Sequence, residues 1–163
     1  GSRALVGHYA RTGELDHIRC MINLDMSGHP KGFGVGGPAG WADLVRTINT
    51  RIHAHDTTFE AKEDEHPGLH SDHQPFLLNG VPVLWPICDL GGHVYGCYHS
   101  SCDDVGLVDP VAMTDNVRRV GQMLWALANM DNLPAGFTDT QLRDRLKAEG
   151  LEEKLRLQNE WRW

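Results

Sequence analysis

The chain has 163 residues, which is enough for one domain with a buried core. Asp and Glu number 22 against 15 Lys and Arg, so the net charge is −7. This charge excludes a phosphate backbone as the main partner, because nucleic-acid binding requires clustered positive charge. No apolar run approaches the roughly 20 residues of a membrane span. We therefore expect a globular domain with no nucleic-acid partner and no membrane span.

The first forty residues predict a helix, a strand and a loop. The helix is expected over residues 2–11, with Ser2 as its N-cap. The apolar run 18–24 is typical of a strand buried on both faces, and Asp25 falls at its C-terminal end. That edge of an open α/β sheet is where ligands bind. Residues 28–40 are rich in Gly and Pro, which predicts a loop with a short extended piece.

The middle of the chain alternates helix and strand signals. Apolar spacing over residues 41–53 predicts a helix. A second apolar strand is expected over residues 81–87, where Pro82 indicates either an edge strand or a position at the start of the strand. Between them the sequence predicts a brief strand, a charged loop and a short helical segment, at residues 57–60, 61–69 and 74–78.

The next part predicts an irregular loop and a long helix. The loop covers residues 89–104, in which Cys97 and Cys102 could close a disulfide or remain free thiols. Asp109, followed by a proline, is the N-cap of a helix that extends to about Met130. The apolar face of this helix is expected to carry Val117, Val120, Leu124 and Leu127.

A last helical region covers residues 138–159 and is interrupted at Gly150. Thr138 and Gln141 suit a capping box at its start. The leucines of this region indicate core packing or a subunit contact. The order of strands and helices along the chain predicts an α/β layered domain. Two strong strands are too few for a complete sheet, so either the sheet is small or the chain is one part of a larger fold.

Asp25 and His99 are placed in a way that suits metal binding. A carboxylate at a strand end and an imidazole in a loop after a later strand are suitable zinc ligands. Each also has a simpler interpretation, Asp25 as a solvated turn residue and His99 as a loop histidine bonded to a neighbour. Asp103 could accept the proton of the second ring nitrogen of His99, as is usual for zinc-bound histidine. Tyr98 places a phenol beside it.

Three other kinds of chemistry are excluded. Ser71, Asp72 and His73 do not form a nucleophilic triad, because adjacent residues cannot generally point at one another in the required geometry. Cys102 lacks an evident oxyanion-donating element, which argues against a thiol nucleophile. The glycine-rich residues 32–40 do not end in Lys-Ser or Lys-Thr, so a phosphate loop is not expected.

Three short segments occur in an order typical of one enzyme family. They are Asn-Leu-Asp-Met-Ser-Gly at 23–28, Ser-Asp-His-Gln-Pro-Phe at 71–76 with Gly-Val-Pro at 80–82, and Tyr-His-Ser at 98–100 with Asp103. Together they resemble the co-catalytic zinc exopeptidases, metallopeptidase family 28, which includes bacterial leucyl aminopeptidases, aminopeptidase Y and glutamate carboxypeptidases. The resemblance implies a three-layer α/β/α sandwich with a mainly parallel mixed sheet. Residues 1–133 would be its C-terminal portion, and residues 134–163 a helical extension that packs on it or on a partner subunit.

The resemblance also implies roles for individual residues. In this family two zinc ions share a bridging aspartate and a bridging water. Asp25 matches an aspartate that holds one ion, and His99 matches a histidine that holds the other. Tyr98 matches a position that in some relatives helps to stabilise the oxyanion. Phe76 and Trp41 are weak candidates for the apolar walls of the substrate pocket, and core packing is the simpler interpretation of both. The residues expected around the ligands are Met26, Ser71, Asp72 and Asp103.

The sequence lacks counterparts of the family's first histidine, its bridging aspartate and its Glu-Glu pair. The opening Gly1-Ser2-Arg3-Ala4 resembles the segment that follows this pair, although Gly1 and Ser2 could also be foreign to the natural sequence. We therefore expect the C-terminal part of a peptidase that by itself binds zinc weakly and hydrolyses little peptide. Its partners would be a peptide substrate and the remainder of the catalytic domain or a complementary chain.

Two alternatives are compatible with the same residues. A glutaminyl-cyclase-like relative would use one zinc ion; Asp103-Asp104 after His99 favours it, whereas the Asn-Leu-Asp-Met segment favours the peptidase. The other alternative is a non-catalytic binding module, or a subunit that requires a partner chain. The C-terminal helix could also form a homo-oligomer, and the family resemblance slightly favours a secreted or periplasmic protein.

Overall fold

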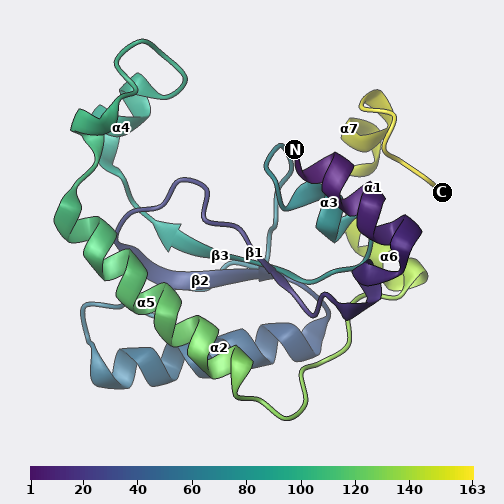
Figure 1. The fold of residues 1–163 in the computed structure, drawn as a ribbon, viewed down its shortest axis with the longest axis horizontal. Helices are drawn as coiled ribbons and strands as arrows, with labels where there is room; N and C mark the ends of the chain where they lie inside the picture. The colour runs from purple at the N-terminus through teal and green to yellow at the C-terminus, as the bar shows by residue number, and fades with distance from the viewer.

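The fold combines helices with one small sheet in a computed structural model that describes all residues, 1–163. Figure 1 shows the sheet near the centre, with helices around it. The strands are β1 (Met21–Ile22), β2 (Pro30–Gly36) and β3 (Val83–Cys88). The helices are α1 (Ser2–Thr12), α2 (Ala39–His55), α3 (Gln74–Leu77), α4 (Gly91–Cys97), α5 (Pro110–Ala128), α6 (Asp139–Ala148) and α7 (Glu152–Leu157). Two short 3-10 helices cover Glu14–His17 and Val105–Leu107.

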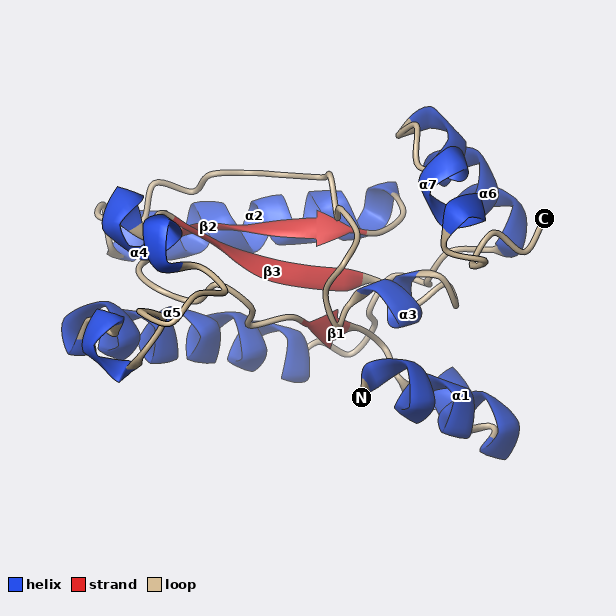
Figure 2. Cartoon of the chain, turned by 90° about the horizontal axis from the view of Figure 1, so that it is seen from above, coloured by secondary structure: helices blue, strands red, loops and turns tan.

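The sheet is mixed and has three strands in the order β1-β3-β2 (Figure 2). β1 is parallel to β3, and β2 is antiparallel to it. This arrangement fits the α/β class, but the longer pairing, β2 with β3, is antiparallel, so the expected mainly parallel sheet is not found within this chain. The predicted strand at 18–24 is reduced to two residues, and it pairs with β3 along one edge only. Because β1 and β3 are parallel, the residues that follow each of them, Asp25 and the segment after Cys88, emerge at the same edge of the sheet.

The short extended piece expected within residues 28–40 is present, but it is longer than predicted and forms the seven-residue strand β2. Phe33 and Val35 are buried on one face, and glycines alternate with them at 32, 34 and 36. The Trp85 ring covers Gly34 so closely that a Cβ there would lie 2.4 Å from a ring carbon. The Asn49 side chain of α2 pairs with both backbone groups of Phe33. It accepts a hydrogen bond from Phe33 N at 3.1 Å and donates one to Phe33 O at 2.9 Å. These glycines therefore provide space for packing, which composition alone does not distinguish from a loop.

β3 is the central strand, so the edge position considered for residues 81–87 is wrong. Pro82 lies just before the strand, consistent with the other interpretation of that proline. Its carbonyl accepts a hydrogen bond from Met21 N at 2.9 Å, which starts the pairing with β1.

One core lies between the sheet and the helices α2 and α5, with Phe33, Val35 and Leu84 on the sheet side. Of the four residues predicted on the apolar face of α5, two are buried and two are exposed. Val120 and Leu127 are buried, but Val117 and Leu124 are 71% and 51% exposed. The helix is rotated from the expected orientation because its buried face also carries polar residues, which the apolar pattern does not mark. These residues are Asn116 and Arg119.

A second core joins α1, α3, α6 and α7, which gather at one side of the sheet (Figure 1). Leu142, Leu146 and Leu155 are fully buried in it, so the leucine stripe of the C-terminal region packs within this chain. The capping box of Thr138 and Gln141 is formed, as predicted.

Four local expectations meet different outcomes. Gly1, and not Ser2, is the N-cap of α1. The brief strand at 57–60 is a turn, because Asp56 Oδ1 accepts bonds from both the backbone N–H and the hydroxyl of Thr58. The loop at 89–104 contains the helix α4. Gly150 adopts a left-handed conformation with φ of 68° after α6, as the expected interruption requires. No helix of the chain has the length and apolar character needed to cross a bilayer.

Gly32→Ala is expected to destabilise the fold by about 3 kcal/mol, at the upper end of overpacking costs. A Cβ at this position would lie 1.9 Å from Lys62 O and 2.5 Å from Lys62 N, both in the backbone. Urea unfolding measures the change. The matched control is Gly92→Ala in α4, where the added methyl meets no atom within 4 Å. Equal unfolding free energies for the two variants would contradict the prediction.

Candidate metal and substrate site

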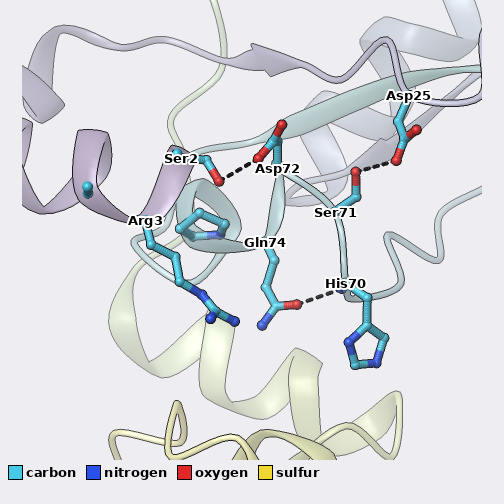
Figure 3. A pocket seen from close by; sticks show the side chains of 10 residues that line it. Ser2, Arg3, Asp25, His70, Ser71, Asp72 and Gln74 are labelled. Carbon is cyan, nitrogen blue, oxygen red and sulfur yellow. Dashed lines mark hydrogen bonds between the residues drawn. The ribbon is translucent and has the colours of Figure 1, made fainter.

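Asp25 lies in the loop between β1 and β2, and Ser71 holds its carboxylate. Ser71 Oγ donates to Asp25 Oδ2 at 2.7 Å, as Figure 3 shows. The Ser71 oxygen in turn accepts a bond from Asn23 Nδ2 at 2.9 Å. A carboxylate with a fixed donor on one oxygen keeps its second oxygen in a defined direction. The predicted place of Ser71 beside Asp25 therefore has a physical basis in this structure.

Asn23 connects this group to a buried histidine. Its side-chain nitrogen lies 3.2 Å from His73 Nδ1, and His73 is only 6% exposed. Because an amide NH₂ can only donate, Nδ1 accepts and the ring proton belongs on Nε2. Nε2 is buried and has no hydrogen-bond partner. Sequence reasoning missed the roles of Asn23 and His73; a polar residue at the end of an apolar strand was the available signal for Asn23.

Asp72 points elsewhere. Its Oδ1 accepts a hydrogen bond from the Ser2 hydroxyl at 2.7 Å, so it joins the start of α1 to the loop before α3 (Figure 3). Asp72 therefore borders the same cavity as Asp25 without contacting it through a hydrogen bond. This cavity has a volume of about 730 Å³ and is lined also by Gly1, Arg3 and Gln74.

A second cavity brings the sequence-predicted residues together. Its volume is about 480 Å³, and Asp25 lines both cavities. It lies where the residues after β1 and after β3 meet, at the shared edge of the sheet. The predicted residues on its wall are Asp25, Met26, Tyr98, His99 and Asp103.

His99 stands in the loop that the Cys97–Cys102 disulfide closes. Its ring stacks on the Tyr98 ring, with centroids 3.9 Å apart and an interplanar angle of 18°. Its backbone is left-handed, with φ of 55°, a conformation that non-glycine residues adopt mainly where the surroundings enforce it. Asp103 lines the same cavity, but no hydrogen bond joins it to His99, so the expected partner of the second ring nitrogen is not in place.

Trp41 and Phe76 do not line either cavity. Trp41 is fully buried in the core under the sheet, and its indole N–H donates to Pro134 O at 3.0 Å. Phe76 is buried in the second core. The structure thus places both in core packing and away from a substrate pocket at this edge.

His29 also lines the second cavity, and the sequence did not indicate it. Its Nδ1 lies 2.7 Å from Asp115 Oδ2, and its Nε2 lies 3.1 Å from Arg119 Nη1. Since guanidinium only donates, Nε2 accepts and Nδ1 carries the proton that Asp115 receives. Both ring nitrogens are engaged, so His29 is not a ligand in this arrangement. It instead ties the start of β2 to α5.

The chain offers zinc the right kind of ligand but too few of them. Asp25 and His99 supply a carboxylate and an imidazole, whereas a catalytic zinc usually has three protein ligands. No group of three or more His, Cys, Asp or Glu side chains could hold an ion. Burial raises the pKa of the free thiols Cys20 and Cys88, and neither thiol lines the two cavities.

Breaking the Cys97–Cys102 bond is expected to loosen the segment that carries His99. The disulfide limits the conformational entropy of the open loop, which corresponds to about 2 kcal/mol. Because the loop is exposed, breaking the bond should loosen only this segment. Hydrogen exchange at the amides of Ser100 and Asp103 should rise after reduction, with little change in melting temperature. A Cys97→Ser/Cys102→Ser variant is the control and should not respond to reductant. Unchanged exchange in the reduced chain would contradict this expectation.

The strand edge, its two cavities and the Asp25–Ser71 pair form a polar site at the edge of an α/β sheet. The sequence profile of peptidase family M28 matches residues 1–125, and the chain belongs to this family. No curated protein and no solved structure matched the chain. Asp25, Ser71 and His99 lie within the matched residues, while α6, α7 and the C-terminal tail lie outside them.

Proposed function

We propose that this chain is the C-terminal part of a zinc-dependent exopeptidase of the aminopeptidase type. The observation that carries the proposal is that Asp25 and His99, 74 positions apart, line one cavity at the edge where β1 and β3 end. Membership of a peptidase family supports hydrolysis of a peptide bond as the reaction. The substrate would be a peptide that presents its N-terminal residue to this edge.

In this proposal Asp25 and His99 each hold one of two zinc ions, which when bound would activate water. Ser71 orients the carboxylate of Asp25 through its 2.7 Å hydrogen bond. The hydroxyl of Tyr98, next to His99, is proposed to donate to the oxyanion. The remaining ligands and the general base would come from the remainder of the catalytic domain or from a complementary chain.

Two features of the surface favour the proposal that the sheet is incomplete and belongs to a larger three-layer domain. β1 has a partner on one edge only, and an unpaired edge is a site for adding another strand. Large apolar side chains are also exposed on α5, among them Trp125 at 72%. A homo-oligomer through the C-terminal helices would have to use their outer faces, where Leu157 is exposed, because Leu142, Leu146 and Leu155 are buried within this chain. The Cys97–Cys102 disulfide favours an oxidising compartment, outside the cell or in the periplasm.

The test compares the 163-residue chain with the protein extended by its natural upstream sequence. Zinc content and hydrolysis of leucyl p-nitroanilide are measured for both. We expect two zinc ions and turnover for the extended protein, and weak binding with little turnover for the short chain. An ordinary enzyme rate from the short chain would refute the need for further ligands. Binding of one zinc ion together with cyclisation of N-terminal glutamine would replace the proposal by the cyclase alternative. An extended protein that neither binds metal nor turns over substrate would replace it by a binding module.

A further inference from the structure

The C-terminal tail reverses direction immediately after α7 and returns toward α1 and α3. Asn159 adopts a left-handed conformation with φ of 58°, which ends the helix. The backbone N–H groups of Glu160 and Trp161 both donate to Leu155 O, at 2.8 and 3.2 Å. This turn fixes the direction in which the side chains of Gln158 and Glu160 extend. All of these residues lie beyond the part of the chain that the family profile matches.

Gln158 and Glu160 meet the side chain of Gln74, which is only 2% exposed. Gln74 Nε2 donates to Gln158 Oε1 at 2.9 Å and to the carboxylate of Glu160. The other carboxylate oxygen of Glu160 forms an ion pair with Arg3 of α1 at 2.7 Å. Glu160 therefore joins α1, α3 and the tail at one point.

Gln74 passes this constraint on to the loop that precedes α3. Its Oε1 accepts a hydrogen bond from His70 N at 2.7 Å, as Figure 3 shows. His70 has a left-handed backbone with φ of 75°, which costs free energy unless surrounding contacts enforce it. Gln158 adds a second contact, between its Nε2 and His70 Nδ1 at 3.3 Å. The next residue in the loop is Ser71, the residue that holds Asp25.

We infer that residues 158–160 are a positioning element for Asp25, acting through Gln74 and Ser71. The tail holds Gln74, Gln74 holds the backbone at His70, and the resulting loop geometry aims the Ser71 hydroxyl at the Asp25 carboxylate. The inference rests on the proposed function only in the role assigned to Asp25 as a ligand. It gives the C-terminal extension a part in the site that family membership does not assign to it.

The experiment is NMR of the 163-residue chain at pH 7, without metal, comparing Gln158→Ala/Glu160→Ala with the unsubstituted protein. Loss of these hydrogen bonds should raise the exchange rate of the His70 amide by about tenfold. It should also shift the side-chain carboxyl ¹³C resonance of Asp25. Amides of β3 should keep their protection, since this strand is hydrogen-bonded to β1 and β2 and not to the tail. The matched control is Glu153→Ala on the exposed side of α7, which should leave both signals unchanged.

Glu160→Gln provides a second variant, because its amide oxygen still accepts a bond from Gln74. Unlike the double variant, it should keep the Asp25 resonance of the unsubstituted protein and most of the His70 protection. The inference is overturned if a folded double variant keeps both signals, if Glu153→Ala changes them equally, or if Glu160→Gln rescues neither. Neither measurement requires zinc or peptide. A failure of the peptidase proposal would therefore appear in metal content and turnover, and a failure of the positioning inference in these resonances.

Discussion

Asp25→Asn, in the protein extended by its upstream sequence, is expected to lower kcat/KM by more than about 100-fold, beyond the range for residues that only support a ligand. Asparagine has nearly the same size as aspartate, and its oxygen can still accept the bond from the Ser71 hydroxyl. The loop should therefore keep its structure while the proposed metal site loses its anionic ligand. Hydrolysis of leucyl p-nitroanilide and zinc content are the two measurements, and both should fall.

Asp131→Asn is the matched control for that variant. Asp131 is exposed and lines neither cavity. It should have the activity and zinc content of the unsubstituted protein. Full activity in Asp25→Asn would show that this carboxylate is only a turn residue, which is the simpler interpretation that the sequence allows.

Arg119→Met is expected to destabilise the fold by about 3 kcal/mol, as for a broken buried ion pair. Arg119 is fully buried and donates to Asp56 Oδ2 at 2.8 Å, Thr58 Oγ1 at 2.6 Å and Pro30 O. Methionine fills much of the volume but leaves the Asp56 carboxylate without its buried partner. Urea unfolding at pH 7 measures the loss.

The neighbouring position supplies the control. Arg118 also pairs with Asp56 Oδ2, at 2.9 Å, but its side chain is 49% exposed. Arg118→Met should therefore cost less than about 1 kcal/mol, as exposed ion pairs do. If Arg118→Met destabilised the protein as much as Arg119→Met, burial of the guanidinium would not be the source of the effect.

The stability contributed by Asp56 should depend on pH. The hydrogen bond from the Thr58 hydroxyl, together with that from Arg119, holds the pKa of Asp56 well below its usual range. The folded protein therefore binds this proton more weakly than the unfolded chain does. The contribution is complete above the unfolded pKa of about 4 and is lost as the pH falls below it. The difference between the unsubstituted protein and Arg119→Met should narrow from pH 7 to pH 3, and a constant difference would contradict this assignment.

The elements with strong apolar periodicity were predictable, and those fixed by packing were not. The helices α2 and α5 follow from spacing and from the cap at Asp109. β2 was predicted only in part, because its glycines make room for segments distant in sequence: Gly34 for the Trp85 ring and Gly32 for the Lys62 backbone. The orientation of α5 depends on Arg119, whose partners His29 and Asp56 lie 90 and 63 positions away in sequence.

The same distinction applies to the site. The family resemblance placed Asp25, Ser71 and His99 together, and the structure brings all three to adjoining cavities. Asn23, His73 and the tail residues that contact Gln74 were not predicted. Their roles arise from hydrogen bonds between segments 48 to 86 residues apart, and a periodic pattern contains no information about such pairs.

Anomalous X-ray diffraction at the zinc edge, from crystals of the protein extended by its upstream sequence, tests the central claim most directly. The claim is that Asp25 and His99 converge on one metal site. We expect two peaks about 3.5–4 Å apart, one within bonding distance of the Asp25 carboxylate and the other of the His99 imidazole. Zinc peaks that avoid both side chains, or an ordered structure in which the two residues face different cavities, would contradict the claim.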